Sequence, residues 1–296
     1  MNLDLPMSDI HAHFHSSGLS LPVTVALALV ASVYLYGWFR LRRDSPTLLP
    51  PWRLVAFMGG LFFFWSVVAS PLAMLDHDLL TVHMINHLVL MAVGAPLVLA
   101  GAPFLLLSHP FPTELDNAVQ NSVRSSAPAQ RLARLIKHPI FCWLCATATV
   151  IGWHLPAVFR LAMRSPWWHH AEYASFMLAG ILFWWPVVQP MSTGSERPSW
   201  STPLYLFLAT LPCDILSAFL VFCGRIVYPS YLSAPRLFNL SPMQDQQCAG
   251  ALMWVFVTFA YLLPAIVITL RILSPQPTPS QLSGERQPGA LLHHAR

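Results

Sequence analysis

The chain has 296 residues, of which 55% are hydrophobic and only 9% are charged, and its formal net charge is +4. Soluble domains carry about 25% charged residues, so this composition excludes an ordinary soluble globule and indicates a polytopic membrane protein. The small basic excess forms no dense Lys/Arg stripe interleaved with aromatic residues. We therefore expect the lipid bilayer, and not nucleic acid, as a partner of the chain.

Seven apolar stretches follow one another along the chain, each close to the ~20 residues that a spanning helix needs. They cover residues 21–39, 51–70, 79–100, 139–157, 171–188, 202–223 and 242–270. Within lipid, helices and closed barrels are the structures that satisfy every backbone hydrogen bond. We predict an all-α fold, a polytopic membrane helix bundle of seven transmembrane helices over residues 20–273, with no internal repeat and no domain boundary.

The distribution of Lys and Arg predicts how the bundle is oriented. With the N-terminus outside, twelve basic residues lie on the cytoplasmic side, and the four that remain outside are Arg160, Arg164, Arg225 and Arg236. This bias agrees with the positive-inside rule, whereas the reverse topology violates it at nearly every loop. The C-terminus is therefore predicted to be cytoplasmic.

The segments outside the spans carry expectations of their own. Residues 1–19 are predicted to form an external tail whose histidines either collect a loosely held metal or have no role: His11, His13 and His15. The tail has no Lys or Arg, so we expect no cleaved signal peptide. Alternating basic and apolar residues over 131–137 predict a short amphipathic helix on the inner surface. Residues 274–296, rich in Pro, Ser and Gln, are expected to be a disordered cytoplasmic tail.

A pair of histidines, His83 and His87, opens the third apolar stretch. Residues four apart lie on one face of a helix with Cβ atoms about 6 Å apart, so the two imidazoles can reach one metal ion. A polar pair within a spanning segment is costly, which favours a functional reason for its presence.

The predicted orientation gathers further histidines at the outer ends of neighbouring helices, because His154 ends the fourth stretch and His169 and His170 precede the fifth. Ligand sites in helix bundles are built from side chains on facing helices. We therefore predict a metal site that faces the outer compartment and consists of His83, His87, His154 and His169. His170 points about 100° away from its neighbour on a helix and is placed among the supporting residues. The alternative is that these histidines pair with lipid headgroups or backbone carbonyls.

Copper is the first choice of metal for this site. Neutral imidazole suits copper, zinc and iron, while thioether sulfur selects soft Cu(I). Met84 lies between the paired histidines, and further methionines lie near the same side: Met74, Met163 and Met243.

Three polar residues are candidates to support the ligands. Glu172 follows His169 by three residues on the same helix face and could orient that imidazole, although a helix-start acid stabilised by the helix dipole is an equally good explanation. Asp245 and Gln247 follow a capping box predicted at 241–244, and the capping box does not explain the presence of either residue. They could hold the metal ligands in place or bind a partner.

Asp214 lies near the middle of the sixth stretch, where an ionisable group is a functional candidate by default. We expect its partner to be a histidine of the third or fourth helix, and the alternative is a protonated or locally hydrogen-bonded Asp. The cysteines are more ordinary, because small, nearly apolar Cys is common in such helices. Cys142 and Cys145 would lie away from the histidines, whereas Cys223 and Cys248 could form a disulfide or a transient thiol ligand.

Five short motifs occur in a fixed order along the predicted helices. They are His83-Met84-Ile85-Asn86-His87-Leu88, Trp153-His154-Leu155-Pro156, Phe183-Trp184-Trp185-Pro186, Tyr228-Pro229-Ser230-Tyr231 and Leu240-Ser241-Pro242-Met243-Gln244-Asp245-Gln246-Gln247. Together they resemble the seven-helix CtaG family of cytochrome c oxidase assembly factors, over roughly residues 50–272. The resemblance implies a multi-pass protein of the bacterial plasma (inner) membrane that helps to build haem–copper oxidase, with copper handling as its proposed role. The family pattern His-x-x-acidic-His at the start of the fifth helix ends here in Tyr173, which leaves open whether His170 substitutes.

The sequence therefore favours a non-enzymatic factor that binds copper near the outer surface and hands it to an oxidase subunit. One alternative is a metal or proton transporter that uses Asp214 as a midplane relay. Another is an intramembrane metalloenzyme, but a zinc protease needs Glu directly after the first His, where this chain has Met84. The sequence leaves the oligomeric state open.

Overall fold

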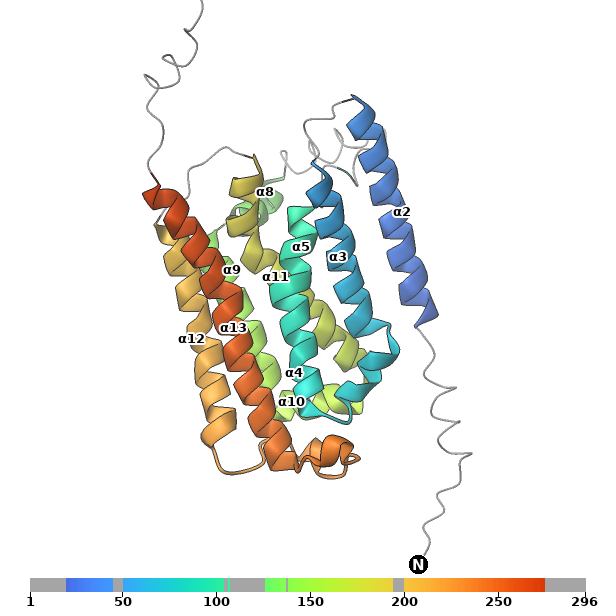
Figure 1. Ribbon diagram of the computed structural model, residues 1–296, viewed down its shortest axis with the longest axis vertical. Helices are drawn as coiled ribbons and strands as arrows, with labels where there is room; N and C mark the ends of the chain where they lie inside the picture. The colour runs from blue at the N-terminus through green and yellow to red at the C-terminus, as the bar shows by residue number, and fades with distance from the viewer. Residues whose placement is uncertain are drawn as a thin grey trace, which may run out of the picture.

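Helices make up all the regular secondary structure in the described part of the chain. The structure is a computed structural model that describes residues 20–44, 50–103, 106, 126–136, 138–193 and 200–274. The predicted N-terminal histidine tail and nearly all of the predicted C-terminal tail lie outside these ranges. The helices run side by side as a bundle, and the first and last described residues lie at opposite ends of it (Figure 1).

Proline marks where many of these helices begin. At the first helical position the missing N–H costs no hydrogen bond, and the fixed φ of Pro already suits a helix. Five helices start in this way: α3 (Pro51–Val68), α9 (Pro139–His154), α10 (Pro156–Arg164), α11 (Pro166–Thr193) and α13 (Pro242–Leu273). The predicted capping box is confirmed at α13, where Ser241 and Gln244 bond each other's backbone N–H.

Six of the described helices are long and apolar enough to cross a membrane. They are α2 (Leu21–Asp44), α3, the rod Leu80–Ala100, α11, α12 (Ser201–Phe222) and α13. The 16-residue α9 would add a seventh span only together with α8 (Ala127–Ile136), the short helix predicted near 131–137, from which it is bent by 72°. The predicted all-α bundle is therefore confirmed for the described residues, which contain six candidate spans, or up to seven.

Several helix boundaries differ from the prediction, and two of them affect the candidate ligands. The fourth stretch was expected to run to residue 157, but α9 ends at His154 because Leu155, which precedes Pro156, has an extended backbone with ψ 127°. A residue before proline avoids the helical region for steric reasons. The fifth helix starts at Pro166 instead of 171, which brings His169 into its first turn.

The rod Leu80–Ala100 is the most buried of the spans and consists of α4 (Leu80–Leu88), the π-helical η2 (Val89–Gly94) and α5 (Ala95–Ala100). It packs against α3, α11 and α13. The approach of α11 is close because Gly180 has no side chain: a Cβ there would lie 2.8 Å from the Met91 carbonyl oxygen. Packing through small residues is typical of membrane helices.

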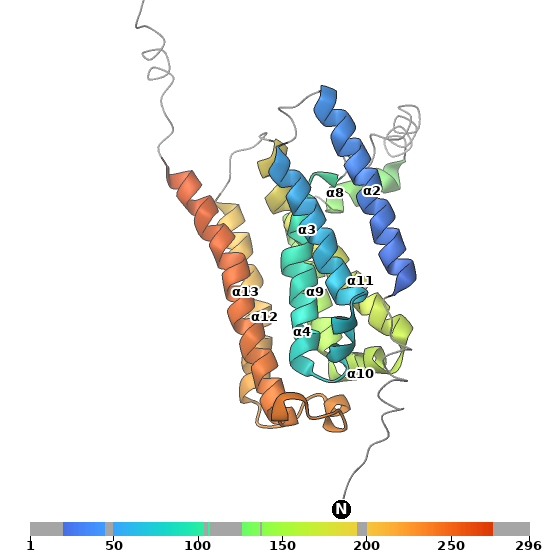
Figure 2. The same ribbon diagram turned by 45° about the vertical axis from the view of Figure 1, so that its right-hand side comes forward.

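Short elements close the end of the bundle at which α4 begins. They are α10, η1 (Pro71–Asp76), η3 (Pro229–Leu232) and η4 (Leu237–Asn239), and they lie at the lower end in Figure 1. α12 and α13 pack along each other, and α13 also meets α4 (Figure 2). The C-terminal ends of α2 and α13, which carry Arg42, Arg43 and Arg271, lie at the opposite end.

Candidate metal site

The two histidines of α4 face a carboxylate from α11. His83 is fully buried and His87 is 4% exposed, and their ring centroids are 4.3 Å apart, as expected for one helical turn. The Nε2 atoms of His83 and His87 lie 3.4 and 3.2 Å from Oε1 of Glu172, which is also fully buried. Three candidate ligands from two helices therefore converge on one point.

A second carboxylate, Asp76 at the end of η1, joins the same group from the other side. Its Oδ2 lies 3.2 Å from Nε2 of His169, and the His169 ring stacks on His83 at 5.7 Å between centroids. The described residues thus contain two sets whose ligand atoms all lie within 4.8 Å of one another: Asp76, His83 and His169 in one, and His83, His87 and Glu172 in the other. We call these five residues the His–carboxylate cluster, and His83 belongs to both of its sets.

The polar atoms of the His–carboxylate cluster are poorly satisfied by the described protein groups. Eight buried atoms make no hydrogen bond of regular geometry: both nitrogens of His83 and His87, Nε2 of His169, both oxygens of Glu172 and Oδ1 of Asp76. The Nε2 atoms and the Glu172 oxygens among them contact one another only as ion pairs of 3.2–4.0 Å. An unpaired buried polar group costs on the order of 1–3 kcal/mol, and native proteins keep few of them. Imidazole nitrogen and carboxylate oxygen together are a donor set that fits a divalent transition metal such as copper or zinc.

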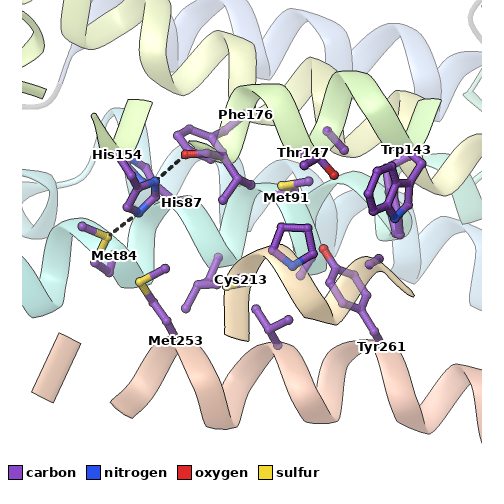
Figure 3. Close-up of a pocket in the computed structure, with 18 residues that line it drawn as sticks. Met84, His87, Met91, Trp143, Thr147, His154, Phe176, Cys213, Met253 and Tyr261 are labelled. Carbon is purple, nitrogen blue, oxygen red and sulfur yellow. Dashed lines mark hydrogen bonds between the residues drawn. The ribbon is translucent and has the colours of Figure 1, made fainter. Parts of the chain in front are cut away.

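His154 lies beside the His–carboxylate cluster but in neither of its sets. Its Nδ1 lies 2.7 Å from the Val150 carbonyl oxygen, its Nε2 lies 3.2 Å from Sδ of Met84, and its ring centroid is 6.0 Å from that of His87. The ring lines a cavity of about 40 Å³ toward the middle of the bundle (Figure 3). The cavity is largely apolar and sulfur-rich, with Met84, Met91, Cys213 and Met253 among its lining residues.

Tyr173, which stands where the family pattern has a histidine, supports Asp76. The Tyr173 hydroxyl donates to the Asp76 carboxylate and accepts a hydrogen bond from Nδ2 of Asn86 at 3.2 Å. Tyr231 donates to the Asp76 backbone carbonyl at 2.7 Å. Burial opposes ionisation of Asp76, but His169, His83 and Tyr173 around it hold the pKa of this carboxyl below its usual range.

His170 does not replace the missing histidine. It is exposed, and its Nδ1 bonds the carbonyl oxygen of Pro166 in its own helix. Glu172 also differs from the expectation, because it lies 4.0 Å from His169 and closer to both histidines of α4. It is therefore placed as a candidate ligand of the pair on α4 and not only as support for His169.

Asp245 and Gln247 take different places. The Asp245 carboxylate accepts hydrogen bonds from the backbone N–H of Leu80 and Thr81 and so caps α4. Gln247 is exposed. Gln246 was not among the predicted site residues. Its buried amide accepts a hydrogen bond from the Val227 N–H and donates to the carbonyl oxygens of Leu220 and Arg225, which fixes the turn after α12.

Asp214 is not joined to the His–carboxylate cluster. It lies on α12 one turn after Thr210, its Oδ1 has no partner among the described groups, and no contact with a histidine is found for it there. The expected His partner is therefore absent from the described residues. All five cysteines of the chain are described and free, so the disulfide considered for Cys223 and Cys248 is not formed.

Asp76 is the cluster residue that the sequence analysis missed. A signal for it exists: Asp76, His77 and Asp78 stand directly before the helix that carries His83. Aromatic rings complete the walls of the cluster, since Phe176 stacks on His87 at 4.1 Å and Phe159 lies 5.0 Å from His83.

The chain is similar to a family of known function. The family described as cytochrome c oxidase caa3 assembly factor (Caa3_CtaG) matches residues 32–274. The uncharacterized protein ML1998 of Mycobacterium leprae (strain TN) is 24% identical over 262 residues, which are 84% of this chain and 38% of that protein. The uncharacterized protein MT0111 of Mycobacterium tuberculosis (strain CDC 1551 / Oshkosh) is 21% identical over 256 residues, 85% of this chain and 38% of that protein.

The chain thus spans less than two fifths of the length of these relatives. No solved structure matches it. The family match covers most of the sequence and includes all five motifs on which the resemblance rested. The chain therefore belongs to the family of cytochrome c oxidase caa3 assembly factors.

Proposed function

We propose that this assembly factor binds copper at the His–carboxylate cluster and hands it to a subunit of a haem–copper oxidase. The observation that carries the proposal is the convergence of three buried histidines and two buried carboxylates from η1, α4 and α11, whose ligand atoms lie within 4.8 Å of one another in two sets. Copper is the cargo in this proposal and not a resident cofactor. The proposed role is non-enzymatic.

The two overlapping sets of ligands suit delivery better than storage. Each set offers three protein ligands, and a metal held by three protein ligands keeps a coordination position open for a ligand from outside. The two negative charges of Asp76 and Glu172 balance the two positive charges of a divalent ion. This balance offsets the cost of burying the ion. His83, which both sets share, would stay bound while its partners exchange.

The arrangement of charge supports a cluster on the outer side of the membrane. The basic last turns of α2 and α13 lie at one end of the bundle, and the cluster lies at the end where α4 begins. By the positive-inside rule, the basic end is cytoplasmic. The cluster would then face the outer compartment of a bacterial plasma membrane, where an oxidase subunit could receive copper.

Transport through Asp214 has less support. The cavity between the cluster and α12 is lined mostly by apolar groups, and Asp214 is not among them. A relay needs a chain of polar groups, and the described residues connect Asp214 to Thr210 of its own helix.

The test compares copper binding with oxidase assembly. The double variant His83→Ala/His87→Ala should lose bound copper in the purified protein and should lower the copper content of the oxidase in cells that depend on this chain. His170→Ala is the matched control, because this histidine is exposed and bonded within its own helix. Unchanged oxidase copper in the double variant would refute delivery.

A further inference from the structure

His154 and Met84 are in direct contact in the interior of the bundle (Figure 3). Both side chains are buried, with 7% and 1% exposure, and Nε2 of the histidine is 3.2 Å from the thioether sulfur. The other ring nitrogen, Nδ1, lies 2.7 Å from the Val150 carbonyl oxygen, which can only accept.

These contacts fix the tautomer of the ring. Since Nδ1 must carry the proton that it donates to the Val150 carbonyl, Nε2 of a neutral imidazole carries a lone pair. A thioether has no hydrogen to give. The Nε2 lone pair of a neutral ring and the thioether sulfur therefore face each other, and both can donate an electron pair to one soft metal ion.

The surroundings of this pair are rich in soft ligands. The cavity that His154 lines also has Met91, Cys213 and Met253 on its wall, from the η2 turn, α12 and α13. Figure 3 draws Met84, His154 and Met253 around the same cavity, which all three line. Thioether and imidazole ligands without carboxylate select Cu(I) over harder divalent ions.

His154 lies between two pockets. His154 lines a second pocket, of about 400 Å³, together with Pro156, Arg225 and Tyr228. Its ring thus borders the interior cavity, and the residue borders the second pocket near the closing short elements.

We propose that His154 and Met84, with Met253 as the third ligand, form a second metal site, which takes Cu(I) and is distinct from the His–carboxylate cluster. The proposal rests on the proposed function only for the choice of copper as the cargo. The chain would then hold two sites of different softness, with ring centroids of His154 and His87 6.0 Å apart. We call the site of His154, Met84 and Met253 the soft site. Its thioether ligands give a selectivity for Cu(I) that carboxylates do not give.

The experiment uses the full chain purified in detergent and titrated anaerobically with Cu(I) against a chromophoric Cu(I) chelator, with X-ray absorption to read the atoms around copper. The wild type should show sulfur neighbours of Cu(I). Met84→Leu, which keeps the volume and removes the sulfur, should weaken Cu(I) binding by at least about 10-fold, the loss seen even when groups behind a ligand are changed. Met177→Leu, a half-buried methionine of α11 outside the cavity, is the control and should change nothing.

Two results would overturn the soft site: only nitrogen and oxygen neighbours of Cu(I) in the wild type, which needs no variant, or unchanged Cu(I) affinity in Met84→Leu. Glu172→Gln separates the two proposals, because it should weaken Cu(II) binding at the cluster, where the set Asp76, His83 and His169 remains, and leave Cu(I) binding intact. Intact Cu(II) binding in Glu172→Gln together with lost Cu(I) binding in Met84→Leu would refute the cluster and support the soft site.

Discussion

The carboxylate of Asp245, in the first turn of α13, caps the N-terminus of α4. Its oxygens accept hydrogen bonds from the backbone N–H of Leu80 at 2.7 Å and of Thr81 at 3.1 Å, and the Thr81 hydroxyl donates to it at 2.6 Å. A negative charge at this position satisfies orphan N–H groups and interacts favourably with the helix dipole. A residue 165 positions along the chain from Leu80 thus fixes the start of the helix that carries His83 and His87.

Asp245→Ala should therefore destabilise the fold and the site together. Loss of a helix cap costs about 1–2 kcal/mol, and the buried N–H groups that it leaves unpaired place the loss at the upper end. Thermal unfolding in detergent should show a lower Tm, and a metal titration should show a lower affinity of the His–carboxylate cluster for metal. Gln247→Ala changes an exposed residue two positions later and should leave both measurements as in the wild type. An unchanged Tm in Asp245→Ala would contradict the capping role.

Tyr173→Phe should weaken metal binding without unfolding the protein. The phenylalanine keeps the ring against His169, 4.5 Å away between centroids, but removes the hydroxyl that bonds Asp76 and Asn86. Groups that hold a ligand in place contribute about 10–100-fold to metal affinity. A metal titration should show a loss in that range with little change in Tm. The control variant His170→Ala changes an exposed neighbour and should bind metal as tightly as the wild type. If His170→Ala bound metal more weakly than Tyr173→Phe, His170 would have to be a ligand.

Gly180→Ala tests the close approach of α11 to the central rod. An added Cβ would lie 2.8 Å from the Met91 carbonyl oxygen and 2.9 Å from its Cα, so the backbone must shift. Overpacking of this kind costs about 1–3 kcal/mol. Gly152→Ala is the matched control, because a Cβ there meets no atom within 4 Å. It should be neutral or raise the stability by about 0.4–1 kcal/mol, since Ala restricts the unfolded chain. Equal Tm values for the two variants would refute the close contact.

The sequence predicted the helices well because lipid leaves an apolar chain few alternatives. Each of the seven apolar stretches coincides with a helix, and the errors are at the ends. Hydropathy placed the end of the fourth helix past Pro156, although Leu155 before that proline cannot stay helical. The start of the fifth helix was missed because His169 and His170 interrupt the apolar pattern between Pro166 and residue 171.

The site was predictable only where it lies within one helix. The spacing of His83 and His87 is visible in the sequence, as is the placement of Glu172 on the same face as His169. Which of these imidazoles Glu172 approaches depends on how α11 is rotated against α4, and a single sequence does not contain that angle. The same reason explains Asp76, which lies in a short connection, and Asp245, whose partners belong to another helix.

Metal-dependent stability gives the last prediction. An ion that binds only the folded state stabilises it, by about 2.7 kcal/mol when its free concentration is 100 times Kd. Adding Cu(II) to the purified chain should therefore raise its Tm, and Glu172→Gln should reduce the rise, because the amide keeps the shape of the carboxylate but not its charge and leaves only the set Asp76, His83 and His169. Asp214→Asn is the matched control, since this carboxyl lies on α12 without a histidine contact among the described residues, and it should retain the full rise. If the Cu(II)-dependent rise in Tm were unchanged in Glu172→Gln and lost in Asp214→Asn, the metal would bind near Asp214 on α12 and not at the cluster. That outcome is the one expected of a transporter.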